Sequence, residues 1–221
     1  MQESDQYLLD LQEREKPTLD NFVVGENAEV LAVLREIAAG GGPTFLYLHG
    51  PKGVGLTHLL KSLVPEQEYR VPLFSPDVSV YTVDDVEELD PGWCRQLLVL
   101  QNAVRASRGA HLVCAGRLPA HRLPLPEDVK SRLVWGLTYA VKPLSEAAQL
   151  SELKRQAAER GIDLTDEMLH WMAVHLPRDM RTLSCVLDEA DRLGLQEQRR
   201  VTLPLLRDAV LAIERRRADG A

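Results

Sequence analysis

Cysteine is scarce in this sequence of 221 residues, and long hydrophobic runs are absent from it. The three cysteines, Cys94, Cys114 and Cys185, are widely spaced and form no CxxC pair, which favours reduced core thiols over a disulfide framework. No stretch approaches the roughly 18 apolar residues of a membrane span, and the N-terminus lacks the basic and apolar segments of a signal peptide. The sequence therefore predicts a cytoplasmic protein with no membrane association.

Positive charge is also in short supply, since the formal net charge is −7. Duplex binding depends on clustered Lys and Arg, so an extended nucleic-acid surface and sequence-specific DNA binding are not expected. The basic run at 215–217 is typical of a solvated helix end. The six histidines form no HExxH pattern, and no certain metal site is predicted from them.

The hydrophobic pattern divides the chain into three parts: a tail at 1–16, an α/β domain at 17–143 and an all-helical domain at 144–221. In the second part, apolar runs alternate with helical stretches, which indicates a parallel sheet covered on both faces. The runs lie at 44–49, 69–74, 79–83, 111–115 and 137–141, and the helical stretches at 27–37 and 93–107. After Pro143 only helical segments follow, near 145–160, 166–175, 179–193 and 203–215, with Ser145, Thr165 and Thr202 as candidate starts.

A glycine-rich loop follows the first apolar run. Residues 50–57 read GPKGVGLT, close to the GxxxxGK[ST] pattern, in which glycines allow backbone N–H groups to surround phosphates. Gly50, Gly53, Gly55 and Thr57 match this pattern, and Thr57 is the expected ligand of magnesium. Leu56 replaces the lysine that contacts the β- and γ-phosphates, so a charge-assisted contact is missing. A glycine-rich turn without any ligand is the alternative interpretation of this loop.

Two carboxylates end the apolar run at 79–83. Asp84 and Asp85 follow it at the Walker B position of a P-loop protein, where the first carboxylate binds magnesium and the second orients the attacking water. Many strands end in aspartate, so the Walker B interpretation of Asp84 and Asp85 rests on the glycine loop about thirty residues earlier.

Several strings resemble the DnaA-type AAA+ family of replication proteins. Residues 18–25 (TLDNFVVG) are similar to the adenine-cradling segment, which implies nucleotide contacts for Phe22 and Val23. Residues 53–60 (GVGLTHLL) resemble GxGKTHLL, and 131–137 (SRLVWGL) resemble SRFxWGL. Arg181, within MRTL at 180–183, matches the sensor 2 arginine. The resemblance covers about 17–214 and implies a P-loop AAA+ sheet domain followed by a small helical lid.

The Hda family has the same layout of a stand-alone module, without the partner domain and DNA-binding domain of the initiator. Its members carry a clamp-binding peptide of QLxLxL type, and residues 6–11 (QYLLDL) are similar to it. The resemblance therefore implies binding of the DNA polymerase sliding clamp through Gln6, Tyr7, Leu9 and Leu11. A hydrophobic staple that tucks the tail onto the domain is the alternative. DnaA and a second copy of the chain are the further partners that the family implies.

The resemblance assigns Arg132 the role of an arginine finger that stabilises the transition state on a neighbour's ATP. On this view Arg132 projects from the domain edge, while Leu133 and Trp135 belong to the core. A surface salt bridge at a helix end is the alternative for this arginine.

Departures from the family pattern favour an activator of another ATPase over an enzyme. Besides Leu56, the sensor 1 segment at 113–117 (VCAGR) lacks the usual polar residues, and the stretch before Asp84 looks shortened. We expect no intrinsic ATPase activity and at best weak nucleotide binding, with ADP preferred and magnesium held by Thr57 and Asp84. The alternatives are an active ATPase of the helicase-loader type and a nucleotide-free AAA+ scaffold subunit.

Overall fold

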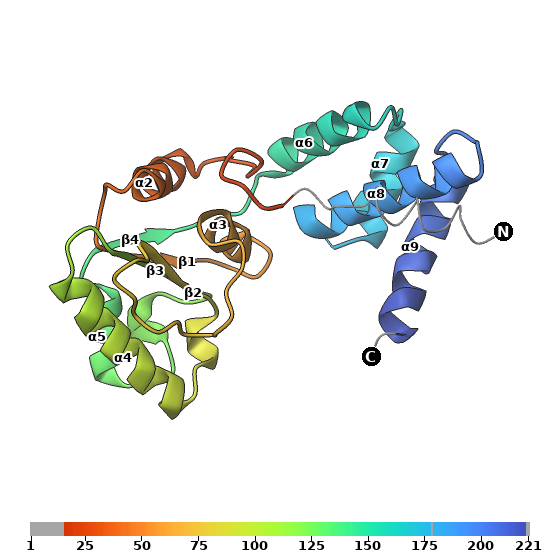
Figure 1. Cartoon of the computed structure of the whole chain (residues 1–221). Coiled ribbons are helices and arrows are strands. Elements are labelled where there is room, and N and C mark those ends of the chain that lie inside the picture. The colour runs from red at the N-terminus through yellow and green to blue at the C-terminus, as the bar shows by residue number, and fades with distance from the viewer. Residues whose placement is uncertain (1–15, 178, 220–221) are drawn as a thin grey trace. The chain divides into compact units, whose positions relative to one another are not determined.

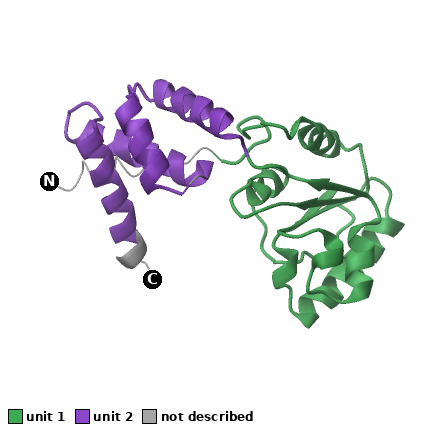
Figure 2. Ribbon diagram, turned by 180° about the vertical axis from the view of Figure 1, so that it is seen from behind, with its two compact units in different colours: residues 1–143 green, residues 144–221 purple. Residues whose placement is uncertain are grey.

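The computed structural model describes residues 16–177 and 179–219, and the chain divides into two compact units after Pro143 (Figure 2). Among the described residues, no helix is both long and apolar enough to cross a membrane. The first unit contains a four-stranded parallel sheet in the order β2-β3-β1-β4. The strands are β1 (Phe45–His49), β2 (Val80–Val83), β3 (His111–Gly116) and β4 (Leu137–Ala140).

Helices cover both faces of this sheet (Figure 1). One face packs against α2 (Ala28–Ala38) and α3 (Leu56–Leu63), and the other against α4 (Pro91–Ala106) and α5 (Glu127–Leu133). Successive side chains of a strand point to opposite faces, so Leu46 and Leu48 join the first core while Phe45 and Tyr47 join the second. Two short 3-10 helices, Val86–Glu88 and Ala120–Arg122, complete the unit. This double burial explains the almost continuous apolar sequence of β1.

One predicted strand is absent from the sheet. Residues 69–74 are irregular, although most of them are apolar. Val71 is buried in the core, and its carbonyl accepts a hydrogen bond from Gln96 Nε2 at 2.5 Å. Tyr81 on β2 binds the Ser75 carbonyl through its hydroxyl at 2.6 Å. The segment at 69–74 is therefore anchored by side chains where a strand would use ladder hydrogen bonds, and the prediction of a strand there was wrong.

The second unit is built from α6 (Glu146–Glu159), α7 (Asp166–His175), α8 (Met180–Gln196) and α9 (Leu203–Asp219). The side chains of Ser145 and Thr165 accept hydrogen bonds from the amides of Ala148 and Met168, so both residues cap the helices that they begin. The unit has its own apolar core, in which Leu187 and Leu206 are fully buried. The prediction of an α/β sheet domain followed by a small helical lid is confirmed at the level of fold.

A buried carboxylate links two helices of this lid. Glu189 on α8 is only 4% exposed, and it accepts two hydrogen bonds from Arg192 at 2.6 and 3.1 Å and a third from Arg216 on α9. Burial alone raises the pKa of Glu189, but the bonds from Arg192 and Arg216 outweigh it and hold the pKa below the usual value near 4.5. A depressed pKa means that this carboxylate stabilises the fold above its unfolded pKa.

Replacing Glu189 by Ala should lower the free energy of unfolding by about 2 kcal/mol at neutral pH, because the hydrogen bonds from Arg192 and Arg216 to a charged group are lost. The difference should shrink as the pH falls through the pKa of Glu189, because the wild-type carboxylate is then neutralised. Urea denaturation of the full chain at several pH values measures both effects. Glu159→Ala removes an exposed ion pair and should change stability by less than about 0.5 kcal/mol. Equal losses in the two variants would contradict this account.

Candidate functional site

The glycine loop connects the buried strand β1 to the start of α3. Gly53 and Gly55 have φ angles of 84° and 100°, in the left-handed region that favours glycine. A Cβ on Gly55 would lie 2.8 Å from the ring of Phe22, and one on Gly50 would lie 2.6 Å from the carbonyl oxygen of Val141. The loop is therefore shaped by backbone conformation and close packing, which is the geometry that a phosphate cradle requires.

The lysine that a phosphate-binding loop carries at its last position but one is replaced by Leu56. Leu56 is the first residue of α3, and its side chain packs against the apolar core on that face of the sheet. Lys52 is exposed within the loop and takes part in no hydrogen bond or ion pair among residues 16–177 and 179–219. The loop therefore offers backbone N–H groups and the N-terminus of α3 to an anion, but no fixed cation at the lysine position.

Thr57 and Asp84 meet directly at the carboxyl end of the sheet. The Thr57 hydroxyl donates to Asp84 Oδ2 over 2.6 Å, and the backbone N–H of Asp85 donates to Asp84 Oδ1 over 2.9 Å. A hydroxyl and a carboxylate in contact are a ligand pair suited to magnesium. Phe22 lies close to this region, since it is buried against Gly55 with its ring centroid 5.6 Å from that of His58. Val23 beside it is half-buried.

Asp85 lies within ion-pair distance of Arg117, which follows β3 in the segment predicted to be sensor 1. Arg117 Nη2 lies 3.7 Å from Asp85 Oδ1, and the same guanidinium contacts Glu87 at 3.3 Å and Glu88 at 3.1 Å. Burial and the neighbouring carboxylates, led by Asp84, raise the pKa of Asp85, whereas Arg117 opposes this rise. Asp85 also has a φ of 43°, which is uncommon for a residue other than glycine. Asp85 therefore belongs to an arginine-linked acidic cluster at the carboxyl edge of the sheet.

Asp85→Asn should raise the melting temperature at pH 7 by about 1–3 °C, because it relieves repulsion between carboxylates and keeps a side chain that the left-handed backbone tolerates. A raised folded-state pKa means that wild-type stability is lost as the pH rises through that pKa. The advantage of the variant should therefore disappear near and below pH 3.8, the ordinary value for this carboxyl group.

Differential scanning calorimetry across pH tests this expectation, with Asp85→Ala as the matched control. The alanine variant removes the same charge but fits the left-handed conformation poorly, so it should gain less. A destabilised Asn variant at neutral pH would show that the contact with Arg117 outweighs the repulsion.

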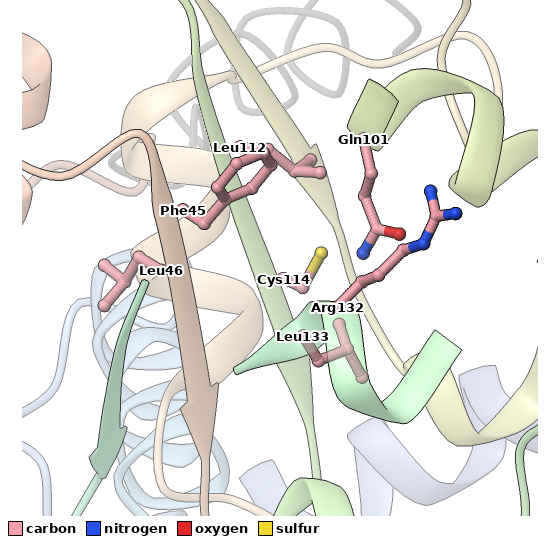
Figure 3. Close-up of a pocket in the computed structure, with 7 residues that line it drawn as sticks. All are labelled: Phe45, Leu46, Gln101, Leu112, Cys114, Arg132 and Leu133. Atoms are coloured by element: carbon pink, nitrogen blue, oxygen red, sulfur yellow. The ribbon is translucent and has the colours of Figure 1, made fainter. Parts of the chain in front are cut away.

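Arg132 lies on α5, at the other end of the sheet. Together with Phe45 and Leu46, the first residues of β1, it lines a narrow pocket (Figure 3). The glycine loop instead follows the last residue of that strand. The length of β1 separates the two features, about 13 Å for a strand of this size. In a parallel sheet the amino ends share one edge and the carboxyl ends share the opposite edge, so the first unit places Arg132 away from its own glycine loop.

The guanidinium of Arg132 is held by neutral groups. Its Nη1 donates to Asn102 Oδ1 over 2.6 Å and to the Leu98 carbonyl oxygen over 3.3 Å, both on α4. Its Cζ lies 5.1 Å from the ring centroid of Trp135. No carboxylate of the described residues lies within ion-pair distance of it. The charge of Arg132 is therefore oriented but not neutralised.

Two expectations about this segment need correction. Leu133 is buried, as predicted, but Trp135 is 39% exposed and does not belong to the core. The reason is Gly136, whose Cα approaches so closely that a Cβ would lie 1.9 Å from the carbonyl oxygen of Phe45. This contact leaves the Trp135 indole at the surface of the first unit, edge-on to the Phe45 ring, with the two ring centroids 5.6 Å apart. Arg132 is half-buried along α4 and does not project freely from the domain edge.

The remaining predicted site residues fall in other parts of the chain. Arg181 is exposed on the first turn of α8 in the helical unit. Gln6, Tyr7, Leu9 and Leu11 lie outside the described residues. Sequence reasoning overlooked Asn102, although its spacing of four from Leu98 places the two on one face of a helix that also carries Arg105.

The fold and the glycine loop together define a AAA+ module, an α/β nucleotide-binding-type domain followed by a helical lid. Residues 146–210 match the family model of the Hda lid domain. Domain III of the Thermotoga maritima replication initiation protein DnaA is similar, with a TM-score of 0.69 and 20% identity over 90% of this chain and 97% of that one. AMPPCP-bound DnaA from Aquifex aeolicus matches with a TM-score of 0.59 and 21% identity over 72% and 59% of the two chains.

The Thermotoga maritima RuvB Holliday junction branch migration motor also matches, with a TM-score of 0.60 and 16% identity over 89% of this chain and 72% of that one. At such identities these likenesses establish the fold. The chain has the fold of the DnaA-type AAA+ proteins, and residues 146–210 of its helical unit are similar to the Hda lid domain.

Proposed function

We propose that this chain is an Hda-type regulator of replication initiation, which lends Arg132 to ATP held by a DnaA molecule. The observation that carries the proposal is the placement of Arg132. It is an un-neutralised guanidinium at the amino edge of the sheet, whereas the chain's own phosphate loop lies at the carboxyl edge and lacks its lysine. Within the first unit, such an arginine serves a nucleotide on a second molecule more readily than its own.

The proposed chemistry is hydrolysis on the partner. Water attacks the γ-phosphorus of DnaA-bound ATP, the bond to the β,γ-bridging oxygen breaks, and ADP and phosphate result. Negative charge on the transferring phosphoryl group and the leaving oxygen is stabilised by the planar fork of Arg132. Conversion of ATP-bound DnaA to its ADP form would regulate initiation negatively. Tethering to the sliding clamp through residues 6–11 would raise the local concentration of the arginine.

The chain's own pocket has a lesser role in this proposal. The backbone cradle around Gly53 and Gly55 fits a phosphate, and Thr57 with Asp84 would hold magnesium, as the contact between them suggests. Leu56 offers no charge to the γ-phosphate, so ADP is the favoured ligand. Phe22 and Val23 would contact the base, and Arg181 would report nucleotide from the lid. A second copy of the chain is a further proposed partner, since AAA+ surfaces commonly pair.

The purified chain should show no measurable ATP hydrolysis and only weak nucleotide binding, with ADP bound more tightly than ATP. Leu56→Lys should raise ATP affinity about tenfold or more, because a hydrogen bond to a charged group contributes about 1.5–3 kcal/mol. Titration calorimetry with magnesium measures both. Leu56→Met keeps the apolar packing without the charge and should behave like the wild type. Tight, magnesium-dependent ATP binding by the wild type would instead favour an active ATPase.

Arg132→Ala should strongly reduce stimulated hydrolysis of ATP on DnaA, by about 10³-fold or more if the arginine acts as other such fingers do. Arg132→Lys should restore little, because an ammonium group does not reproduce the planar fork. The assay combines clamp loaded on DNA, this protein and ATP-bound DnaA. Folding and clamp binding should be unchanged in both variants. Undiminished stimulation by Arg132→Ala would refute the mechanism.

A tail variant is the matched comparison in the same assay. Changing Gln6, Leu9 and Leu11 to Ala should abolish clamp binding while leaving the melting temperature almost unchanged. If clamp binding survives, the tail assignment is wrong, whereas the arginine assignment still stands or falls on Arg132 alone.

A further inference from the structure

Residues 16–21, at the beginning of the described chain, form a small closed turn. The Thr18 N–H donates to Asn21 Oδ1 over 2.9 Å, and the Asn21 N–H donates back to Thr18 Oγ1 over 3.1 Å. Asn21 Nδ2 also donates to the Lys16 carbonyl oxygen over 3.1 Å. Local bonds of this kind fix the shape of a segment, but they do not fix its position on the domain. That position depends on contacts between the turn and other elements.

His58 on α3 contacts this turn and the residue that follows it. Its Nε2 lies 2.9 Å from the Thr18 carbonyl oxygen, forty residues away along the chain. A carbonyl oxygen can only accept, so Nε2 carries the proton and donates it to this bond. The His58 ring also packs against the buried Phe22, with the two ring centroids 5.6 Å apart. His58 therefore holds the segment 16–22 in two ways, by a hydrogen bond and by a ring contact.

The helical turn that carries His58 also belongs to the phosphate loop. The helix α3 begins directly after Gly55, whose φ of 100° turns the loop into the helix. Thr57, the neighbour of His58, donates its hydroxyl proton to Asp84 over 2.6 Å. Because Thr57 and His58 are consecutive residues of one helical turn, the position of the segment 16–22 is tied to that of the glycine loop.

A second tether of the segment is more exposed. Asp20 Oδ1 accepts a hydrogen bond from Arg35 Nη2 on α2 over 2.8 Å, but the side chains of Arg35 and Asp20 are 55% and 88% exposed. Exposed ion pairs contribute little, because water and salt screen them. His58 is half-buried, so its bond to Thr18 is the stronger candidate for setting where the segment stands relative to the glycine loop.

We propose that His58 is a positioning residue for the base-contacting segment of the nucleotide pocket. Its bond to Thr18 holds Phe22 and Val23 at a fixed distance from the glycine loop, so that the base and the phosphates of one ADP molecule are met together. Such preorganisation lowers the ordering cost of binding, which matters most in a loop that lacks its lysine. This inference rests on the proposed ADP site and deepens it by assigning a role to a residue that acts through its neighbours.

Three variants of His58 separate the hydrogen bond from the ring contact. His58→Gln keeps an N–H donor without the ring, His58→Phe keeps a ring without the donor, and His58→Leu removes both. Each full chain is titrated with ADP in the presence of magnesium. His58→Gln should bind ADP within about twofold of the wild type. Affinity should fall about three- to tenfold in His58→Phe and His58→Leu, the range expected for the loss of one neutral hydrogen bond.

A control variant and a second ligand separate positioning from other effects. Asp20→Asn removes the exposed tether of the same segment and should leave ADP affinity within about twofold of the wild type. Inorganic pyrophosphate with magnesium carries phosphates without a base, so its affinity should change by less than about twofold in all three His58 variants. Melting curves of each variant establish that it is folded.

The possible results distinguish this inference from the proposed function. If His58→Phe binds ADP like the wild type, the positioning role is overturned and the ADP site stands. The same conclusion follows if His58→Gln is as weak as His58→Leu, because the ring and not the donor is then responsible. Equal losses of ADP and pyrophosphate affinity would assign His58 to the phosphate loop and overturn the inference. If the wild type binds no ADP, the ADP site and the role of His58 are both refuted, whereas Arg132→Ala still tests the arginine finger by itself.

Discussion

All strands of the sheet in the first unit are parallel. Segments that follow the strands therefore lie at one edge of the sheet, and segments that precede the strands lie at the opposite edge. The central strand β1 lies between β3 and β4 and is buried on both faces, and its two ends lie at these opposite edges. The carboxyl edge receives the glycine loop and the aspartates that follow β2, whereas the amino edge receives α5 and Arg132. A phosphate cradle and a cation for phosphate are thus present in one domain but separated by the sheet, a geometry suited to action between molecules.

The two edges of the sheet also differ in whether the cations that lie there are paired with carboxylates. At the carboxyl edge the lysine position is apolar, and Arg117 is paired with the acidic groups around Asp85. Lys52 is exposed in the glycine loop, but no fixed cation occupies the lysine position of that loop. At the amino edge Arg132 has a hydrogen-bonding amide and an aromatic face but no carboxylate partner among the described residues. Under the proposed function, Arg132 is therefore the cation that stays available to a phosphate group outside this chain.

Several features were predictable because they depend on local pattern. The glycine loop follows from the spacing of Gly50, Gly53 and Gly55 after an apolar run, and the helical lid follows from the caps and the 3.6-residue periodicity after Pro143. The strand expected at 69–74 was wrong for a physical reason. Local apolar character determines that a segment is buried, but whether it pairs in a ladder depends on distant partners such as Gln96 and Tyr81.

The sequence by itself determined the class of fold and the missing lysine at Leu56, because both are properties of residue identity and spacing. Its resemblance to the DnaA-type family implied the candidacy of Arg132. Only the tertiary structure decided that Trp135 lies at the surface and that Arg132 is hydrogen-bonded to groups of α4. The close contact of Gly136 with the Phe45 backbone sets the course of the chain there, and Asn102 reaches Arg132 across thirty residues of sequence. Such long-range contacts arise from how helices pack on the sheet, and no local pattern encodes them.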